Sequence, residues 1–245
     1  MKGIMTIFRR EFAAYFNTPL AYVFLVIFLM LTGVFTFYMG QFFSREQADL
    51  VPFFSYHPWL YLFLVPAVAM RLWAEERRAG TIELLLTLPV ATGAVVMGKY
   101  LAALAFTGLA LALTFPIWIT VSWLGDPDQG VIVTGYLSSI LMAGAYLAIG
   151  AALSATTRNQ VIAFILTVSV CFLFIVSGLN LVLDLFSGWA PDAVVQMVAN
   201  LSFLTHFENL QRGVVGLYDV FYFVSVIVLF LWINRVVLEA KREAG

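Results

Sequence analysis

Long uncharged stretches dominate the chain and indicate its fold class. Six apolar stretches carry no Asp, Glu, Lys or Arg: residues 12–44, 50–70, 100–125, 129–157, 159–183 and 220–234. Most can cross about 30 Å of hydrocarbon as a helix, and they are apolar all round, whereas strands of membrane barrels alternate apolar and polar residues. The pattern predicts an all-α membrane protein with a single domain, 1–245, and six transmembrane helices. We place these helices at 20–41, 57–73, 96–124, 132–155, 160–183 and 218–238.

Two of these helices are less regular than the others. Pro52, His57, Pro58 and Pro66 interrupt the second stretch, and proline inside a membrane helix relies on neighbouring helices to satisfy the freed backbone groups. The last stretch is short for a span unless Arg235 extends its side chain to the membrane surface. We therefore expect the boundaries of these two helices to be the least regular.

The first 18 residues are typical of a helix that lies at the membrane surface. Large apolar side chains share one broad helical arc: Ile4, Ile7, Phe8, Phe12 and Tyr15. Arg9 and Arg10 face away from this arc, and Glu11 is the exception to the pattern. The late position of these charges and the long apolar run that follows argue against a secretory signal peptide.

Composition and charge exclude a water-soluble protein and indicate an orientation. The chain is 62% hydrophobic and 11% charged, whereas soluble domains carry roughly a quarter charged residues. If the N-terminus is cytoplasmic, every Lys and Arg except Arg45 and Arg212 falls on the cytoplasmic side, as the positive-inside rule requires. Both termini are then cytoplasmic. The net charge of −1 gives no indication of a nucleic-acid partner.

The longest hydrophilic interruption lies at residues 74–83, within the segment 74–90 that joins the second and third spans. Its five charged side chains would each cost about 2.5–3.5 kcal/mol at the bilayer centre, so the segment stays in the cytoplasm. Gly80 ends the local helix, Thr81 can cap a new one and Pro89 ends it, which predicts a short helix at 82–88. The other cytoplasmic loop contributes Thr157, Arg158 and Asn159.

Residues 184–217 are too polar and too rich in glycine to span a membrane, and we expect one or two short extracytoplasmic helices there. Val194, Val198, Leu201 and Leu204 recur at helical spacing in this segment. His206, Glu208 and Arg212 are its candidate functional residues. A structural ion pair between Glu208 and Arg212, one helical turn apart, is favoured over contact with a substrate.

Few residues indicate chemistry on this chain. GAVVMGKY at 93–100 nearly matches a phosphate-binding loop, but Tyr100 replaces the required Ser or Thr and no strand precedes it; the glycines favour close packing, with Lys99 as an anchor at the membrane surface.

The sequence gives no sign of a metal site or of catalysis. No His lies at a metal-ligand spacing from a second His, a Cys or a carboxylate, and we interpret Cys171 as an apolar core residue. No nucleophile and base pair favours an enzyme. The spans carry almost no ionisable residue, which argues against an ion gradient as the driver and favours energy from another subunit.

Three segments carry a family resemblance. AEERRAGTIELLLTLPV and the GKY that follows, within 74–100, resemble the signature of ABC type-2 permeases, the membrane subunits of ABC transporters. REFAAYFNTPLAYV at 10–23 and HFENLQRGVVGLYDVFYF at 206–223 resemble the gliding-motility type of these permeases. Spans three to five match only in hydropathy and spacing.

The resemblance implies a multi-pass permease in the cytoplasmic (inner) membrane of a bacterium or archaeon, for export of a hydrophobic or envelope-associated substrate. It also implies a separate ATPase that binds ATP and Mg²⁺, leaving this chain without a cofactor, and a second copy or a related permease that completes the path. The implied ATPase-coupling residues are Glu75, Glu76, Arg77, Arg78, Gly80, Thr81 and Glu83. Thr157, Arg158 and Asn159 form a possible second contact. A membrane anchor that docks the ATPase without moving substrate is the alternative.

Overall fold

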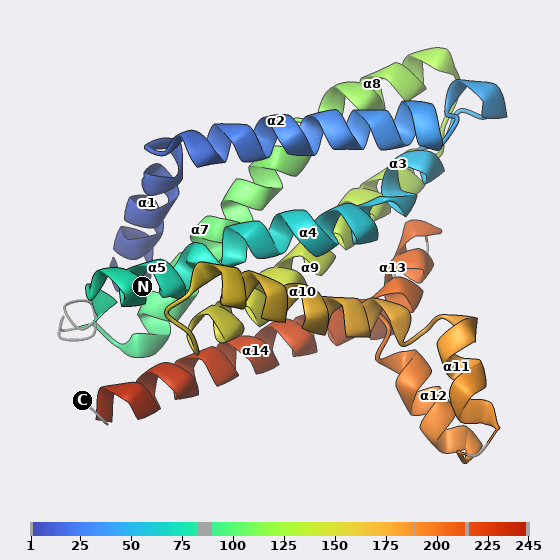
Figure 1. The fold of residues 1–245 in the computed structure, drawn as a ribbon. Coiled ribbons are helices and arrows are strands. Elements are labelled where there is room, and N and C mark those ends of the chain that lie inside the picture. Colours follow the sequence, from blue (N-terminus) through green and yellow to red (C-terminus); the bar gives the residue numbers. More distant parts are fainter. Residues whose placement is uncertain (1, 83–89, 189, 214–215, 244–245) are drawn as a thin grey trace.

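The computed structural model describes the chain except residues 1, 83–89, 189, 214–215 and 244–245, and all described elements are helices (Figure 1). This agrees with the predicted all-α fold class. The helices are α1 Lys2–Phe16, α2 Pro19–Val34, α3 Val51–Ser55, α4 His57–Ala69, α5 Arg71–Ala79, α7 Thr92–Ala112, α8 Phe115–Leu124, α9 Gln129–Ser154, α10 Gln160–Val176, α11 Asn180–Ser187, α12 Asp192–Asn200, α13 Phe203–Gln211 and α14 Leu217–Glu243. A π-helical turn, Phe35–Met39, extends α2, and a 3-10 turn follows at Phe43–Arg45.

Four helical segments of the described chain are long and apolar enough to cross a membrane: Pro19–Arg45, Thr92–Leu124, Gln129–Ser154 and Leu217–Arg242. The pair α10 and α11 makes a fifth if it counts as one span, although it bends by 79°. The expected span at 57–73 is interrupted at Met70, and α4 has 13 residues, or about 20 Å at 1.5 Å per residue. The protein is therefore a multi-pass membrane protein with four or five such helices in the described residues.

Helix α9 lies at the centre of the bundle and packs against α4, α7, α10 and α14. Its glycines allow the neighbouring helices to approach closely. A Cβ atom added at Gly150 would collide with the Cβ of Ala69 on α4, and one at Gly135 would collide with the ring of Phe54 on α3. Glycines of α9 thus occupy positions where a neighbouring helix approaches too closely for a larger side chain.

The chain returns repeatedly to the same two ends of the bundle (Figure 1). One end, called here the charged end, holds α1, α5, the 155–159 loop and the C-terminal part of α14. The opposite end holds α3, α11, α12 and α13. The charge-rich segments predicted to face the cytoplasm therefore lie together.

The apolar residues of segment 184–217 do not share one helix. Leu201 ends α12, while Leu204 lies in α13. Ser202 separates the helices because its hydroxyl accepts a hydrogen bond from Thr205 N at 3.4 Å and caps α13. The four apolar residues that recur at helical spacing are therefore divided between two helices by the cap at Ser202.

Candidate functional site

A buried cluster of charges joins three helices at the charged end. Lys99 on α7 is 3% exposed, and its Nζ lies 2.8 Å from Glu76 Oε1 on α5 and 3.0 Å from Glu11 Oε2 on α1. The Trp73 ring lies 5.3 Å from the same ammonium, within the range of a cation–π contact. We call Lys99, Glu11, Glu76, Trp73 and the adjacent Arg10 the Lys99 cluster. The ammonium of Lys99, expected as an anchor at the membrane surface, is enclosed by two carboxylates.

The cluster explains the exception in the first helix. Glu11 and Ile7 lie one helical turn apart on the side of α1 that faces α7. Ile7 lies against Gly98 there, and Glu11 reaches Lys99. Gly98 permits this approach, since an added Cβ would lie 2.8 Å from Ile7 Cγ2 and 3.1 Å from the Ile4 carbonyl oxygen. The segment that resembles a phosphate loop is therefore part of helix α7, and its glycine serves close packing.

The cluster holds two cations, Lys99 and Arg10, and two carboxylates, Glu11 and Glu76. Arg10 forms an ion pair with Glu11, and its Nη2 also lies 3.9 Å from Glu76 Oε1. Burial raises the pKa of Glu11, but Lys99 and Arg10 outweigh burial and hold this pKa below its ordinary value of 4.5. Glu11 is thus held in its charged form by two cations.

The lowered pKa of Glu11 predicts a loss of stability in acid. Because the pKa is lower in the folded state, the contribution of Glu11 is fully present above about 4.5 and is lost as the pH falls through the folded-state pKa. The Glu11→Gln variant should lack this part of the acid dependence. Melting temperatures in detergent between about pH 7 and pH 3 test it, with the exposed carboxylate variant Asp126→Asn as control. Equal acid sensitivity of Glu11→Gln and the parent protein would contradict the assignment.

A second set of contacts ties α5 and α14 to the end of α9. Arg77 Nη1 donates to the Ala155 carbonyl at 2.6 Å, and Lys241 Nζ donates to the same oxygen at 3.0 Å. The carbonyls at a helix C-terminus lack partners within the helix, and the helix dipole favours cations there. Burial and the nearby Arg158 lower the pKa of the Arg77 guanidinium. Three separate parts of the chain therefore meet at Ala155.

Ser154 completes this junction from α9. Its hydroxyl accepts hydrogen bonds from Trp73 N at 3.1 Å and Ala74 N at 3.0 Å, and it donates to the Met70 carbonyl at 2.8 Å. It thereby satisfies free amides in the first turn of α5, which a local cap would normally do. Sequence reasoning missed Ser154 and Lys241, and it did not find the partners of Lys99, since nothing local marks these distant contacts.

The predicted coupling residues divide into two groups. Glu76 and Arg77 bind their own chain, whereas Glu75, Arg78, Gly80 and Thr81 are exposed. Glu75 forms an ion pair with Arg71 one turn earlier, at 2.8 Å. Gly80 ends α5 with a φ of 71°, as the sequence predicted, and Thr81 N donates to the Glu76 carbonyl. Glu83 and nearly all of the expected helix at 82–88 lie outside the described residues.

The remaining predicted site residues at the charged end lie outside the Lys99 cluster. Arg9 and Arg158 are exposed. Asn159 caps α10 by accepting a hydrogen bond from Val161 N at 2.9 Å, and Thr157 Oγ1 accepts from Asn159 N at 3.1 Å. The loop thus presents Arg158 to solvent on a hydrogen-bonded turn.

At the opposite end, His206 bridges three helices. Its Nδ1 lies 2.6 Å from Asp219 Oδ1 on α14, and its Nε2 lies 3.0 Å from the carbonyl of Asn200 at the end of α12. The ring also stacks on Tyr222 with 3.9 Å between ring centroids. His206 therefore holds α13 against its neighbours.

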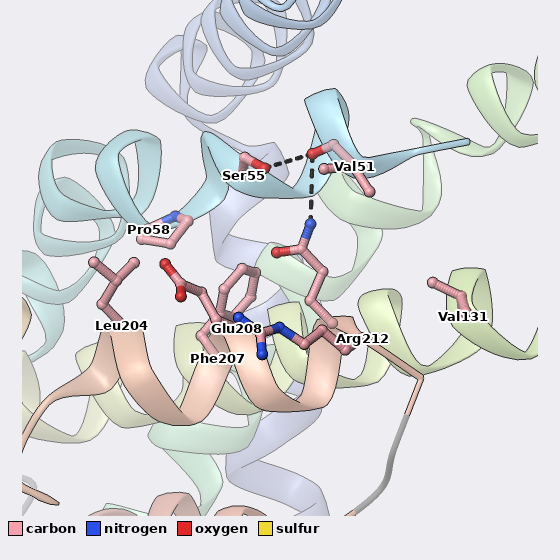
Figure 2. A pocket seen from close by; sticks show the side chains of 9 residues that line it. Val51, Ser55, Pro58, Val131, Leu204, Phe207, Glu208 and Arg212 are labelled. Atoms are coloured by element: carbon pink, nitrogen blue, oxygen red, sulfur yellow. Dashed lines mark hydrogen bonds between the residues drawn. The ribbon is translucent and has the colours of Figure 1, made fainter. Parts of the chain in front are cut away.

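Glu208 and Arg212 do not form the expected ion pair among the described side chains. Figure 2 shows the Glu208 carboxylate turned toward Pro58 and Leu204, where α13 faces α4. Both charged residues line a cavity of about 460 Å³, here called the outer pocket. Its lining residues are Val51, Ser55, Pro58, Val131, Leu204, Phe207, Glu208, Gln211 and Arg212. Within the described part of the chain, no three His, Cys, Asp or Glu side chains converge as a metal site would require.

Comparison with known proteins identifies the family. The search of curated proteins gives no match. The family model described as ABC-2 family transporter protein matches residues 5–237, a range that includes the Lys99 cluster, Ala155 and the outer pocket. The chain therefore belongs to the ABC-2 family of transporter proteins, as the membrane permease subunit of an ABC transporter.

Proposed function

We propose that this permease forms a translocation path with a second copy or a related permease, and that a separate ATPase, which binds ATP and Mg²⁺, drives it from the charged end. The substrate is hydrophobic or envelope-associated and is exported. The Lys99 cluster is the observation that carries the proposal, because it joins the segment nearest the predicted ATPase contact to a membrane-spanning helix. The gliding-motility subgroup and the inner membrane of a bacterium or archaeon are part of the same proposal.

The proposed topology has six spans with both termini in the cytoplasm. Support comes from the course of the chain, since α4 and α5 run back from the opposite end to the charged end beside α2 and α10 (Figure 1). Helix α4 is short, but α3 and α5 extend it and most of its residues are buried against other helices. Such a segment needs less lipid-facing length than an isolated helix.

Exposed and buried residues of α5 are proposed to have different tasks. Glu75 and Arg78 offer charges to the ATPase, and Arg78 is exposed on the last turn of the helix. Glu76 and Arg77 transmit movement, because one contacts Lys99 and the other contacts the end of α9. Charge-assisted hydrogen bonds are short and directional, so a displacement of α5 is passed to α7 and α9 as a rigid-body shift.

Substitutions on α5 test this division after co-expression with the ATPase encoded beside the permease. Arg78→Glu is expected to reduce the amount of co-purified ATPase by about tenfold, because it reverses a charge at the docking surface. Glu76→Gln is expected to retain the ATPase but to lower substrate-dependent ATP hydrolysis. Arg45→Glu, a charge reversal at the opposite end, is the matched control.

Two results would contradict parts of the proposal. Full ATPase recovery with Arg78→Glu, Glu75→Lys and their combination would remove the docking assignment. ATPase recruitment without ATP-dependent substrate movement in proteoliposomes would favour the anchor function instead.

A further inference from the structure

The outer pocket has a composition that ATPase coupling does not explain. Glu208 and Arg212 lie one turn apart on α13, a spacing at which opposite charges normally pair. Among the described side chains they form no ion pair, and both line the same cavity. The remaining walls come from α3, α4 and α9, so the cavity lies where four helices meet at the end opposite the Lys99 cluster (Figure 2).

The lining combines one cation, one anion and an apolar wall. Arg212 offers a planar set of donors that suits phosphate oxygens, and Glu208 accepts hydrogen bonds from an ammonium group. Leu204, Phe207 and Val131 add apolar surface. Gln211 braces the site, since its amide donates to the Val51 carbonyl at 3.4 Å and links α13 to α3.

We propose that the outer pocket binds a phosphoethanolamine group, with the phosphate on Arg212 and the ammonium on Glu208. A simple anion would leave the Glu208 carboxylate repelling it, and a simple cation would meet the same difficulty at Arg212. A quaternary ammonium carries no N–H to donate to Glu208. The volume of 460 Å³ lies within the range of about 300–1,000 Å³ that is usual for small-molecule sites.

Two sources carry this group, a membrane phospholipid and the free compound. The apolar wall suits the glycerol and acyl part of a lipid in the outer leaflet. This placement in the outer leaflet rests on the proposed function, which puts the charged end in the cytoplasm. Binding of phosphoethanolamine requires no ATPase. A failure to bind would therefore contradict this inference without contradicting the proposed permease function.

Native mass spectrometry of the full-length protein tests the proposal, with phosphatidylethanolamine, phosphatidylglycerol and phosphatidylcholine of equal chain length. The parent protein should retain phosphatidylethanolamine most strongly. Glu208→Gln should reduce its preference over phosphatidylglycerol by about tenfold while Arg212 still binds phosphate, and Arg212→Gln should weaken both by about tenfold. Arg45→Gln and Asp126→Asn remove exposed charges at the same end, outside the pocket, and should change nothing.

Competition with soluble phosphoethanolamine separates the two sources. Displacement of the lipid by an excess of the soluble compound supports headgroup recognition, with the lipid as the ligand. Binding of the soluble compound without retention of the lipid also supports the site and assigns the free compound. Equal retention of the three lipids together with no binding of the soluble compound would overturn the proposal, as would unchanged preference in both pocket variants.

Discussion

Replacing Lys99 with Met is expected to lower the free energy of unfolding by about 3–5 kcal/mol, because it leaves two partly buried carboxylates without their shared cation. Glu11 and Glu76 each have 19% of the side chain exposed, and the Lys99 side chain has 4%. Met keeps the length and apolar packing of the lysine stem, so the loss reports on charge. Unfolding by denaturant titration in mild detergent measures it.

A rescue variant separates lost pairing from lost packing. Combining Lys99→Met with Glu11→Gln and Glu76→Gln removes the three buried charges and should recover a large part of the stability, since only Arg10, whose side chain is 54% exposed, then stays charged. Arg242→Met, at an exposed position of the same end, should change stability little. A triple variant as unstable as Lys99→Met alone would mean that the cluster acts through shape rather than charge.

Gly150→Leu is expected to prevent normal assembly of the bundle, at a cost of about 3 kcal/mol or more. The added side chain would meet Ala69 on α4, with Thr167 Cγ2 on α10 3.1 Å from its Cβ. The Cβ atom of Ala69 is fixed to the backbone, so it cannot move without shifting α4. The yield of monodisperse protein and its melting temperature in detergent measure the effect.

Position-matched variants make this result specific. Gly33→Leu adds the same side chain to α2, where an added Cβ meets nothing within 4 Å, and it should be tolerated. Gly150→Ala should be destabilising alone but substantially corrected by Ala69→Gly, which removes the colliding atom. Normal yield of Gly150→Leu, or no correction in the double variant, would show that α4 and α9 can separate without cost.

Local patterns in the sequence were enough to predict the helical membrane fold. Apolar runs mark the helices, and the distribution of Lys and Arg gathers the charged segments at one end. The segment expected as the second span is not one continuous helix, because Met70 separates α4 from α5. Ser154, far along the chain, accepts hydrogen bonds from the first turn of α5 at this break, a contact that no local pattern marks.

The candidate sites were harder to predict, because their partners are distant in sequence. Glu11 and Lys99 are 88 residues apart, and helical periodicity indicates only which face a residue occupies. The same local reasoning wrongly paired Glu208 with Arg212, where the neighbouring α3 and α4 create a cavity instead. It also grouped Glu76 with Arg78, although one is directed inward and the other outward.

The junction at Ala155 bears on how the protein is made. Lys241 is translated 86 residues after Ala155, so until α14 emerges from the ribosome Arg77 is the earlier partner of this carbonyl, and water or lipid headgroups must take the place of Lys241 at Ala155 and Thr156. Helix α14 also supplies Ile227, which packs near Gly144 in the middle of α9. The central helix therefore enters the membrane with one side uncovered, and the bundle closes only when the final helix is inserted.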